Sequence, residues 1–308
     1  MSESSPPLAK TLRRLNMSAA REDAVALTSQ GSLVTGPPPV PSSELPRRPG
    51  LLRRQGFKRL LPIISVLIFL AVWQIVGSRI NPILLATPSA VGQAFVDINR
   101  EGLLWPAFSR AMEVLVVGLG IAGVAGIAIG VLMGRSDTAY RTLNPYVAFF
   151  QATPLIALTP LVVIWFGIGF QSEVAVTVLL AVWSVIINTS EGVRNTPESL
   201  LDMARIYQAS ERSIIRQIAL PHAIPYMFAG LRIALAKGMI GVIIAEMDVS
   251  LKGLGGLVED FGNSFQTARL LAAIITSSCV GVIGTIILEL VRRRVAPWAG
   301  RSQAKTQA

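Results

Sequence analysis

The sequence predicts an all-α polytopic membrane protein with six transmembrane helices. About half of its 308 residues are hydrophobic (52%), only 15% are charged, and the mean hydropathy is +0.56. Such a composition is typical of a chain that lies in a bilayer. Apolar segments recur at roughly the twenty residues needed to cross the hydrocarbon. Because backbone groups in lipid must be hydrogen-bonded within the segment, these spans are expected to be helices.

The six predicted spans cover residues 60–77, 114–133, 146–169, 174–189, 223–245 and 270–291. Basic residues gather in alternate connections, and the positive-inside rule places those connections in the cytoplasm. These residues are Arg53, Arg54, Lys58, Arg59, Arg135, Arg141, Arg194, Arg205, Arg212, Arg216, Arg292, Arg293 and Arg294. Both termini of this multi-pass protein are therefore predicted to be cytoplasmic.

Three regions are predicted along the chain. Residues 1–59 are rich in proline and serine and contain no continuous apolar core, which indicates a flexible cytoplasmic tail without a secretory signal. Residues 60–294 form the six-span domain, with a long cytoplasmic connection over residues 191–222. Residues 295–308 form a short cytoplasmic tail.

The net charge of +10 raises the question of nucleic acid. The basic residues lie beside the apolar runs and no aromatic residues are interleaved with them, so lipid rather than nucleic acid is the expected partner. Cys279 and His222 are each the only residue of their kind, and therefore no metal site, catalytic residue or cofactor is expected. The sequence also contains no phosphate-binding G-x-x-x-x-G-K-[ST] motif, so this chain is not expected to bind ATP.

Two spans carry residues that alter helix packing or shape. Gly126 and Gly130 have the four-residue spacing that lets two helix backbones approach closely. Pro154 and Pro160 each remove a backbone donor and are expected to bend or break the third span. The bend either lines a passage or serves packing alone.

The fifth span contains two basic residues, Arg232 and Lys237. A charge at the centre of a span costs about 2.5–3.5 kcal/mol on insertion scales, so each needs a partner. Residues five apart are about 140° apart around a helix and do not share a face. One of the two faces an anionic solute, or each pairs with a carbonyl or with Glu246, or reaches an interface.

The connection over residues 191–222 is neither apolar enough to span a membrane nor rich in glycine and serine. Thr196, Pro197 and Glu198 predict a helix start, and that helix is expected to end near Gln208. A second helix is expected to begin after a Ser210 cap and to stop at Pro221. The pair would form a docking surface for a partner, or alternatively an amphipathic segment on the lipid surface.

The stretch DMARIYQASERSIIRQIALPHAIPYMFAGLRIAL, which begins at Asp202, resembles the cytoplasmic signature of ABC-importer permeases. In that family the loop fits a cleft of the ATPase and transmits its closure. The coupling residues that the resemblance implies are Asp202, Ala204, Gln208, Ala209, Ser210, Ile218, Leu220 and Pro221.

Three positions depart from the family pattern. Asp202 is one methylene shorter than the usual acid, Met203 replaces a small residue, and Gln208 stands where glycine is expected. If that last position requires a positive φ, a residue other than glycine costs on the order of 1 kcal/mol. The expectation is docking through a somewhat altered turn.

Further segments are similar to the nitrate, sulfonate and taurine importer permeases: ILLATPSAVGQAFVDI, TPLIALTPLVVIWFGIG, GVIIAEM and LKGLGGLVEDFGNSF. The resemblance implies a type I ABC-importer permease fold in the inner membrane and transport by alternating access. It also implies cytoplasmic P-loop ATPase subunits, a second permease copy that is identical or homologous, and an external solute-binding protein. A small, sulfonate-like or nitrate-like anion is the implied solute, and ATP would be bound by the partner. The expected passage residues are Gln151, Thr153, Lys237 and Glu246.

Two alternatives are weighed against this interpretation. An ion-coupled secondary transporter would place carboxylates within its spans and show repeated halves. Neither is expected, since Glu246 and Glu289 lie at the ends of their predicted segments. An integral membrane enzyme would need a nucleophile and base or a cluster of His, Cys and Asp, which the sequence does not offer.

Overall fold

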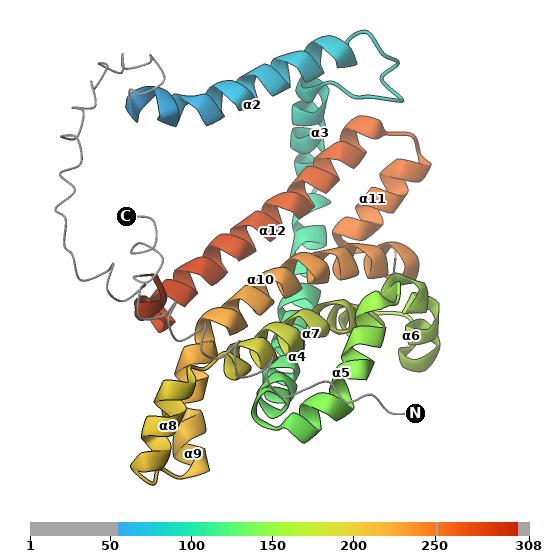
Figure 1. The fold of residues 1–308 in the computed structure, drawn as a ribbon. Helices are drawn as coiled ribbons and strands as arrows, with labels where there is room; N and C mark the ends of the chain where they lie inside the picture. Colours follow the sequence, from blue (N-terminus) through green and yellow to red (C-terminus); the bar gives the residue numbers. More distant parts are fainter. Residues whose placement is uncertain (1–54, 251, 301–308) are drawn as a thin grey trace, which may run out of the picture. The chain divides into compact units, whose positions relative to one another are not determined.

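The computed structural model describes residues 55–250 and 252–300, and within these ranges the chain is helical without any β-strand (Figure 1). The chain divides into two units, Met1–Leu61 and Pro62–Ala308. The predicted N-terminal tail lies outside the described residues except for the start of helix α2. Of the predicted C-terminal tail, the described part is helical, because Val295 ends the last long helix and Pro297–Gly300 forms a 3-10 helix.

The elements follow one another along the sequence from α2 onward. They are α2 (Gln55–Gly77), α3 (Pro88–Arg100), α4 (Leu104–Arg135), α5 (Asp137–Ala152), η2 (Leu155–Leu158), α6 (Thr159–Phe166), α7 (Phe170–Arg194), α8 (Glu198–Ile206), α9 (Glu211–Ile214), η3 (Ile215–Ala219), α10 (Leu220–Ala245), η4 (Glu246–Ser250), α11 (Gly253–Asn263), α12 (Thr267–Val295) and η5 (Pro297–Gly300). Of the short elements, η2 and η5 are 3-10 helices, and η3 and η4 are π-helical.

Local sequence explains several of these boundaries. Thr87 caps α3 by accepting a hydrogen bond from the Ala90 amide at 3.3 Å, and Pro88 follows at a position where a missing amide costs nothing. Ser136 ends α4 and caps α5 in the same way, with the Ala139 amide at 3.2 Å. Gly167, at φ 75°, ends α6 in a conformation that favours glycine.

Five helical segments are long and apolar enough to cross a membrane, and a bent pair supplies a sixth span. The five are Leu60–Gly77, Leu104–Arg135, Phe170–Arg194, Glu211–Val249 and Thr267–Val295. Each contains one of the predicted spans but most extend well beyond it. The six-span, all-α prediction is therefore confirmed, with helices longer than hydropathy alone indicated.

The third predicted span is the bent pair. Helix α5 and the η2–α6 segment meet at 92° across a break at Thr153 and Pro154. Pro154 lies in the break, whereas Pro160 lies in the first turn of α6, where its missing amide is tolerated. The prediction that these prolines bend or break the helix is confirmed, and Pro154 marks the place.

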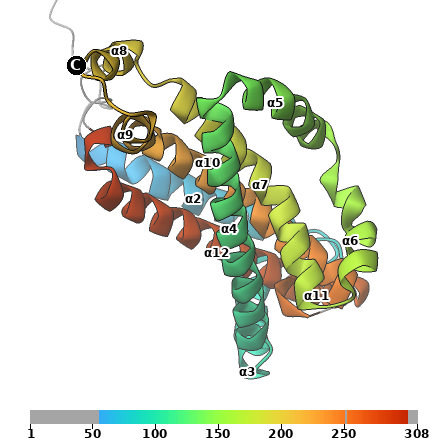
Figure 2. The ribbon, with the colours of Figure 1, turned by 90° about the horizontal axis from the view of Figure 1, so that it is seen from below.

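Helices α4, α7 and α10 form the packed centre of the second unit (Figure 2). Glycines on α4 bring it against α7: a Cβ on Gly126 would lie 2.6 Å from the Cβ of Val185, and one on Gly130 would lie 2.6 Å from the Cβ of Thr189. Real side chains do not approach so closely, so only glycine allows this contact. The predicted close approach at these two glycines is confirmed.

Pro221 does not end a helix, contrary to the sequence prediction. The chain stays helical from α9 through the π-helical turn η3 into α10, and Pro221 lies in the first turn of α10. The Leu220 amide donates to the Ile215 carbonyl, a π-type hydrogen bond that widens the turn just before the proline. A proline at this point is tolerated because the preceding turn has already left the α-helical register.

Candidate functional site

The segment between α7 and α10 forms a helical hairpin, α8 and α9, that projects beyond the packed helices (Figure 1). The predicted helix start at Thr196, Pro197 and Glu198 is confirmed, because α8 begins at Glu198 with Pro197 at the capping position. The Thr196 hydroxyl donates to the Val193 carbonyl at 2.8 Å. Ser210 does cap α9 as predicted, accepting a hydrogen bond from the Ser213 amide at 3.3 Å. Of the two helix starts in the hairpin, only that of α9 has a side-chain cap.

The end of α8 is a complete left-handed helix termination. The Ala209 amide donates to the Ala204 carbonyl and the Gln208 amide donates to the Arg205 carbonyl, both at 2.9 Å. This pair of bonds defines the Schellman motif, which requires a left-handed residue, and Gln208 supplies it at φ 54°. The expectation of an altered turn is therefore wrong for the backbone, because Gln208 adopts the conformation that glycine would adopt.

Exposed apolar side chains surround this turn. The exposed fraction is 54% for Met203, 79% for Ile206 and 81% for Tyr207. Met203 and Ile206 belong to the nine-residue helix α8, and Tyr207 is its C-cap; all three lie outside the segments that could span a membrane. An apolar surface of this kind on a projecting hairpin is typical of a protein interface.

The coupling residues implied by the resemblance take different positions on this hairpin. Asp202, Gln208 and Ser210 are exposed, whereas Ala204 is buried at 8% exposure. The half-buried members are Ala209, Ile218, Leu220 and Pro221. Leu220 packs on a buried cluster that includes Met227, so it connects the hairpin to the helix core.

Two ion pairs join the region of the hairpin to neighbouring helices. Arg135, the last residue of α4, pairs with Glu211, the first residue of α9. Arg194, the last residue of α7, pairs with Asp137 of α5 at 2.9 Å and stacks over the Tyr140 ring at 4.2 Å. The ends of α4 and α7 and the start of α5 therefore lie at the same end of the helix core as the hairpin.

The four predicted passage residues lie on different elements. Gln151 is exposed at the end of α5, and the Thr153 hydroxyl, at the break, donates to the Phe149 carbonyl at 2.8 Å. Lys237 is half-buried on α10, and Glu246 is fully buried beside α11. The first two residues therefore lie at the end of α5 and the other two on α10 and η4. Both α5 and α10 pack on α7.

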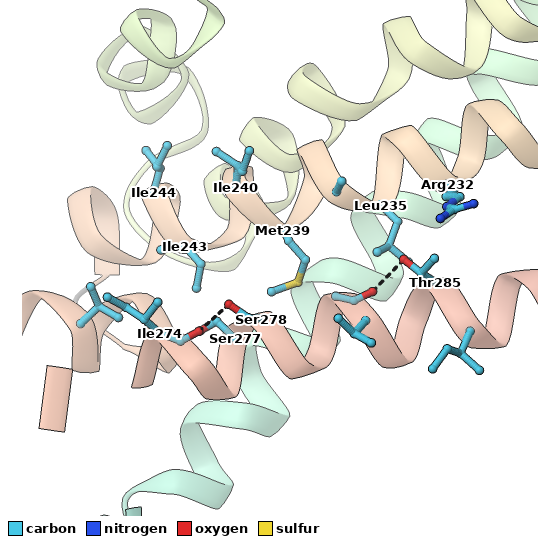
Figure 3. A pocket seen from close by; sticks show the side chains of 15 residues that line it. Arg232, Leu235, Met239, Ile240, Ile243, Ile244, Ile274, Ser277, Ser278 and Thr285 are labelled. Carbon is cyan, nitrogen blue, oxygen red and sulfur yellow. Dashed lines mark hydrogen bonds between the residues drawn. The ribbon is translucent and has the colours of Figure 1, made fainter. Parts of the chain in front are cut away.

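Arg232 lies at one end of a groove of about 660 Å³ between α10 and α12 (Figure 3). The groove is mainly apolar, with Leu235 and Met239 on one side and Ser277 and Ser278 on the other. No carboxylate among the described residues lies within ion-pair distance of Arg232 or Lys237. Pairing of Lys237 with Glu246 is therefore absent from the described part of the chain.

A buried charge cluster was missed by the sequence analysis. Arg110 on α4 lies 3.0 Å from the Glu173 carboxylate on α7, and Glu173 is fully buried. Arg110 also stacks over the Phe170 ring at 4.9 Å. The predicted spans left Arg110 and Glu173 in connections, because α4 and α7 begin earlier than the apolar runs do. The sequence did offer a signal that the helix begins before Arg110. Glu113 follows Arg110 by three residues, the spacing of neighbours on one helix face, and their charged groups lie 3.9 Å apart.

This arrangement defines an integral membrane transport subunit: long apolar helices, a broken span, ionisable residues within the helix core and a projecting hairpin. A family model described as "Binding-protein-dependent transport system inner membrane component" matches residues 126–297. The chain belongs to this family. It is the permease subunit of an ABC importer for small solutes, and a transport subunit rather than an enzyme.

Curated relatives agree over most of the chain. It is 27% identical over 246 residues to the formylaminopyrimidine transport permease protein ThiX of Halalkalibacterium halodurans, covering 80% of this chain and 98% of the relative. It is 28% identical to a putative aliphatic sulfonates transport permease protein, SsuC of Bacillus subtilis, and the match covers 82% of this chain and 91% of the relative. It is 29% identical to the nitrate import permease protein NrtB of Leptolyngbya laminosa, and the match covers 83% of this chain and 94% of the relative. The predicted relation to sulfonate, nitrate and taurine permeases is confirmed.

A solved structure shows the same fold. A chain of the inward-facing MetNI methionine ABC transporter superposes with a TM-score of 0.52 at 19% identity, covering 60% of this chain and 93% of that chain. The predicted ABC-importer permease fold is confirmed.

Proposed function

We propose that this permease docks a cytoplasmic P-loop ATPase through the hairpin of α8 and α9 and receives its solute from an external binding protein. The observation that carries the proposal is the projecting turn with its exposed Met203, Ile206 and Tyr207 side chains. Burial of an apolar side chain of this size stabilises a complex by about 1.5–3 kcal/mol. ATP binds to the partner and the chain itself forms the passage, as two copies that are identical or homologous.

We propose that the hairpin and both termini are cytoplasmic, and the distribution of charge supports this for the hairpin and for the end of α12. Arg135 and Arg194 end α4 and α7 at this end of the helix core, and Arg292 to Arg294 end α12. The positive-inside rule assigns an end with this excess of arginine to the cytoplasm. Attachment of a membrane-impermeant label to single cysteines, introduced at residues 207 and 84 of a chain in which Cys279 is replaced by Ala, tests the assignment. Only the cysteine at residue 84 is expected to react from outside.

The docking surface is tested by co-purification of the full chain from its native membrane in mild detergent. An ATPase subunit should accompany the wild-type chain and be lost with Ile206→Glu and Tyr207→Glu. Leu84→Glu is the matched control, because Leu84 is 75% exposed and apolar but precedes α3 in another connection. Retention of the ATPase by both hairpin variants would contradict the proposal that this surface binds the ATPase.

We propose a small anion as the solute. The relatives named for sulfonates, nitrate and bicarbonate support this class. Lys237 supports it as well, being half-buried on α10 with no described carboxylate within ion-pair distance. Uptake should fall when Lys237 is replaced by Gln, more for an anion than for a neutral solute of equal size. Equal uptake by the variant and the wild-type chain would remove Lys237 from the passage, leaving Gln151 and Thr153 as its proposed polar residues.

A further inference from the structure

A single helical path connects the hairpin to the opposite end of the helix core. From Glu211 to Val249 the chain remains helical for 39 residues, a length of about 58 Å at 1.5 Å per residue. The hairpin lies at one end of this path and α11 at the other (Figure 1). Glu246 is the first residue of η4, directly after α10. One continuous helical element therefore connects α9 to Glu246.

Glu246 is bound to the first turn of α11. Its Oε2 accepts a hydrogen bond from the Gly255 amide at 2.8 Å, and the whole residue is buried. The first amides of a helix lack partners within the helix and carry partial positive charge. A carboxylate at this position is therefore held both by the hydrogen bond and by the helix dipole.

Two glycines make room for this contact. Gly253 has a φ of 78°, and a Cβ there would collide with the Glu246 carboxylate. A Cβ on Gly255 would collide with the Ile243 carbonyl oxygen and lie 2.7 Å from the Glu246 Cβ. Gly262 in the same helix has no atom within 4 Å of such a Cβ. The Glu246 contact therefore requires glycine at the start of α11 but not at Gly262 near the end of the helix.

Helix α11 also forms one wall of a polar cleft. The cleft has a volume of about 700 Å³ and lies between the start of α4 and α11. Its lining includes Arg110, Lys252, Glu259, Asp260 and Asn263. Gly253 and Gly256, in the first turn of α11, also line this cleft, so the cleft and the Glu246 contact share the start of α11. A shift of α11 relative to α4 changes the width of this cleft.

We propose that Glu246 is a positioning residue for transport, which holds α11 to the end of α10 so that the polar cleft changes with the position of the hairpin. The inference rests on the proposed docking of an ATPase at the hairpin. It assigns the carboxylate a contact within the chain, in place of a contact with solute in the passage. Glu246→Gln distinguishes the two roles, because its amide oxygen still accepts from Gly255 but its charge is gone.

The test uses the complex of permease, ATPase and binding protein in proteoliposomes, with four variants. Gly255→Ala and Glu246→Ala should lower the maximal transport rate about tenfold, a typical size for a lost coupling, while the solute concentration at half-maximal rate stays unchanged. Glu246→Gln should restore most of the transport, and Gly262→Ala should match the wild-type chain. Hydrogen exchange in the permease should rise in α11 for Gly255→Ala and remain unchanged in α8.

The outcomes separate this inference from the docking proposal. If the wild-type chain binds no ATPase, the docking proposal fails. If it binds and transports but Gly255→Ala and Glu246→Ala transport at the wild-type rate, the positioning role is overturned. Loss of transport in Glu246→Gln equal to that in Glu246→Ala would also overturn it and return Glu246 to the passage. Unchanged exchange in α11 of Gly255→Ala would show that the contact does not hold the helix.

Discussion

The guanidinium group of Arg110 on α4 lies 3.0 Å from the Glu173 carboxylate on α7, and the two residues join helices that are far apart in sequence. Glu173 is fully buried, whereas the Arg110 side chain is 28% exposed. A buried carboxylate without its cation is unfavourable because it has lost its water and gained no partner. The pair therefore fixes the relative position of the starts of α4 and α7.

Replacing Arg110 by Met should destabilise the protein by about 3–5 kcal/mol, because Glu173 would remain as an uncompensated buried charge. The double variant Arg110→Met and Glu173→Leu should recover most of this loss, since it removes both charges. Thermal unfolding in detergent measures the two changes. A double variant that is less stable than Arg110→Met would contradict the assignment of Glu173 as the residue left unpaired.

Gln208→Gly should raise the stability of the α8 terminus by roughly 0.5–1 kcal/mol, because glycine adopts the left-handed conformation without the cost borne by a side chain. Gln208→Val should lower it, since a branched side chain fits this conformation poorly. Rates of limited proteolysis within residues 198–214 report the change. Equal rates for the three chains would show that the φ of 54° at Gln208 carries no cost.

Gly130→Val should prevent α4 from packing on α7, because its new Cβ would lie 2.6 Å from the Cβ of Thr189 and 2.8 Å from the Ile186 carbonyl oxygen. Overpacking of this kind typically costs about 1–3 kcal/mol, and more where backbone must move. Gly120→Val is the control on the same helix, since no atom lies within 4 Å of its Cβ. Size-exclusion profiles in detergent should show aggregation of the first variant only.

The charge exchange Arg135→Glu with Glu211→Arg should retain the attachment of α9 to α4, whereas each single change places like charges together. The Arg135 side chain is 28% exposed and the Glu211 side chain 67%. The expected coupling energy between these two exposed charges is therefore only about 0.2–1 kcal/mol. A double-mutant cycle on unfolding measures it at low and high salt. A coupling that does not weaken with salt would argue against an exposed ion pair.

The sequence was sufficient for features that depend on local residues. Hydropathy located all six spans because each must supply about twenty apolar residues of its own. Pro154 predicted the break and Ser210 the cap of α9, since both act on their own backbone neighbours. The start of α3 could have been predicted in the same way, because Thr87 and Pro88 form a cap followed by a first-turn proline.

Other features needed the tertiary structure. A proline usually stops a helix, but Pro221 follows a π-helical turn and continues into α10, which no local rule distinguishes. Ala204 matches the family pattern and yet is buried, while its neighbours Ile206 and Tyr207 are exposed. Which side of a short helix faces outward depends on what it packs against.

By itself the sequence determined that this chain crosses a membrane six times as helices, breaks its third span and carries the signature of a permease hairpin, because length, apolarity and caps act within a segment. Only the tertiary structure decided that Arg110 meets Glu173 and that Glu246 accepts a hydrogen bond from Gly255 of α11. The physical reason is that a charge in a helix core is stabilised by partners from other helices. Their proximity is set by the packing of α4, α7 and α10, which no single segment encodes.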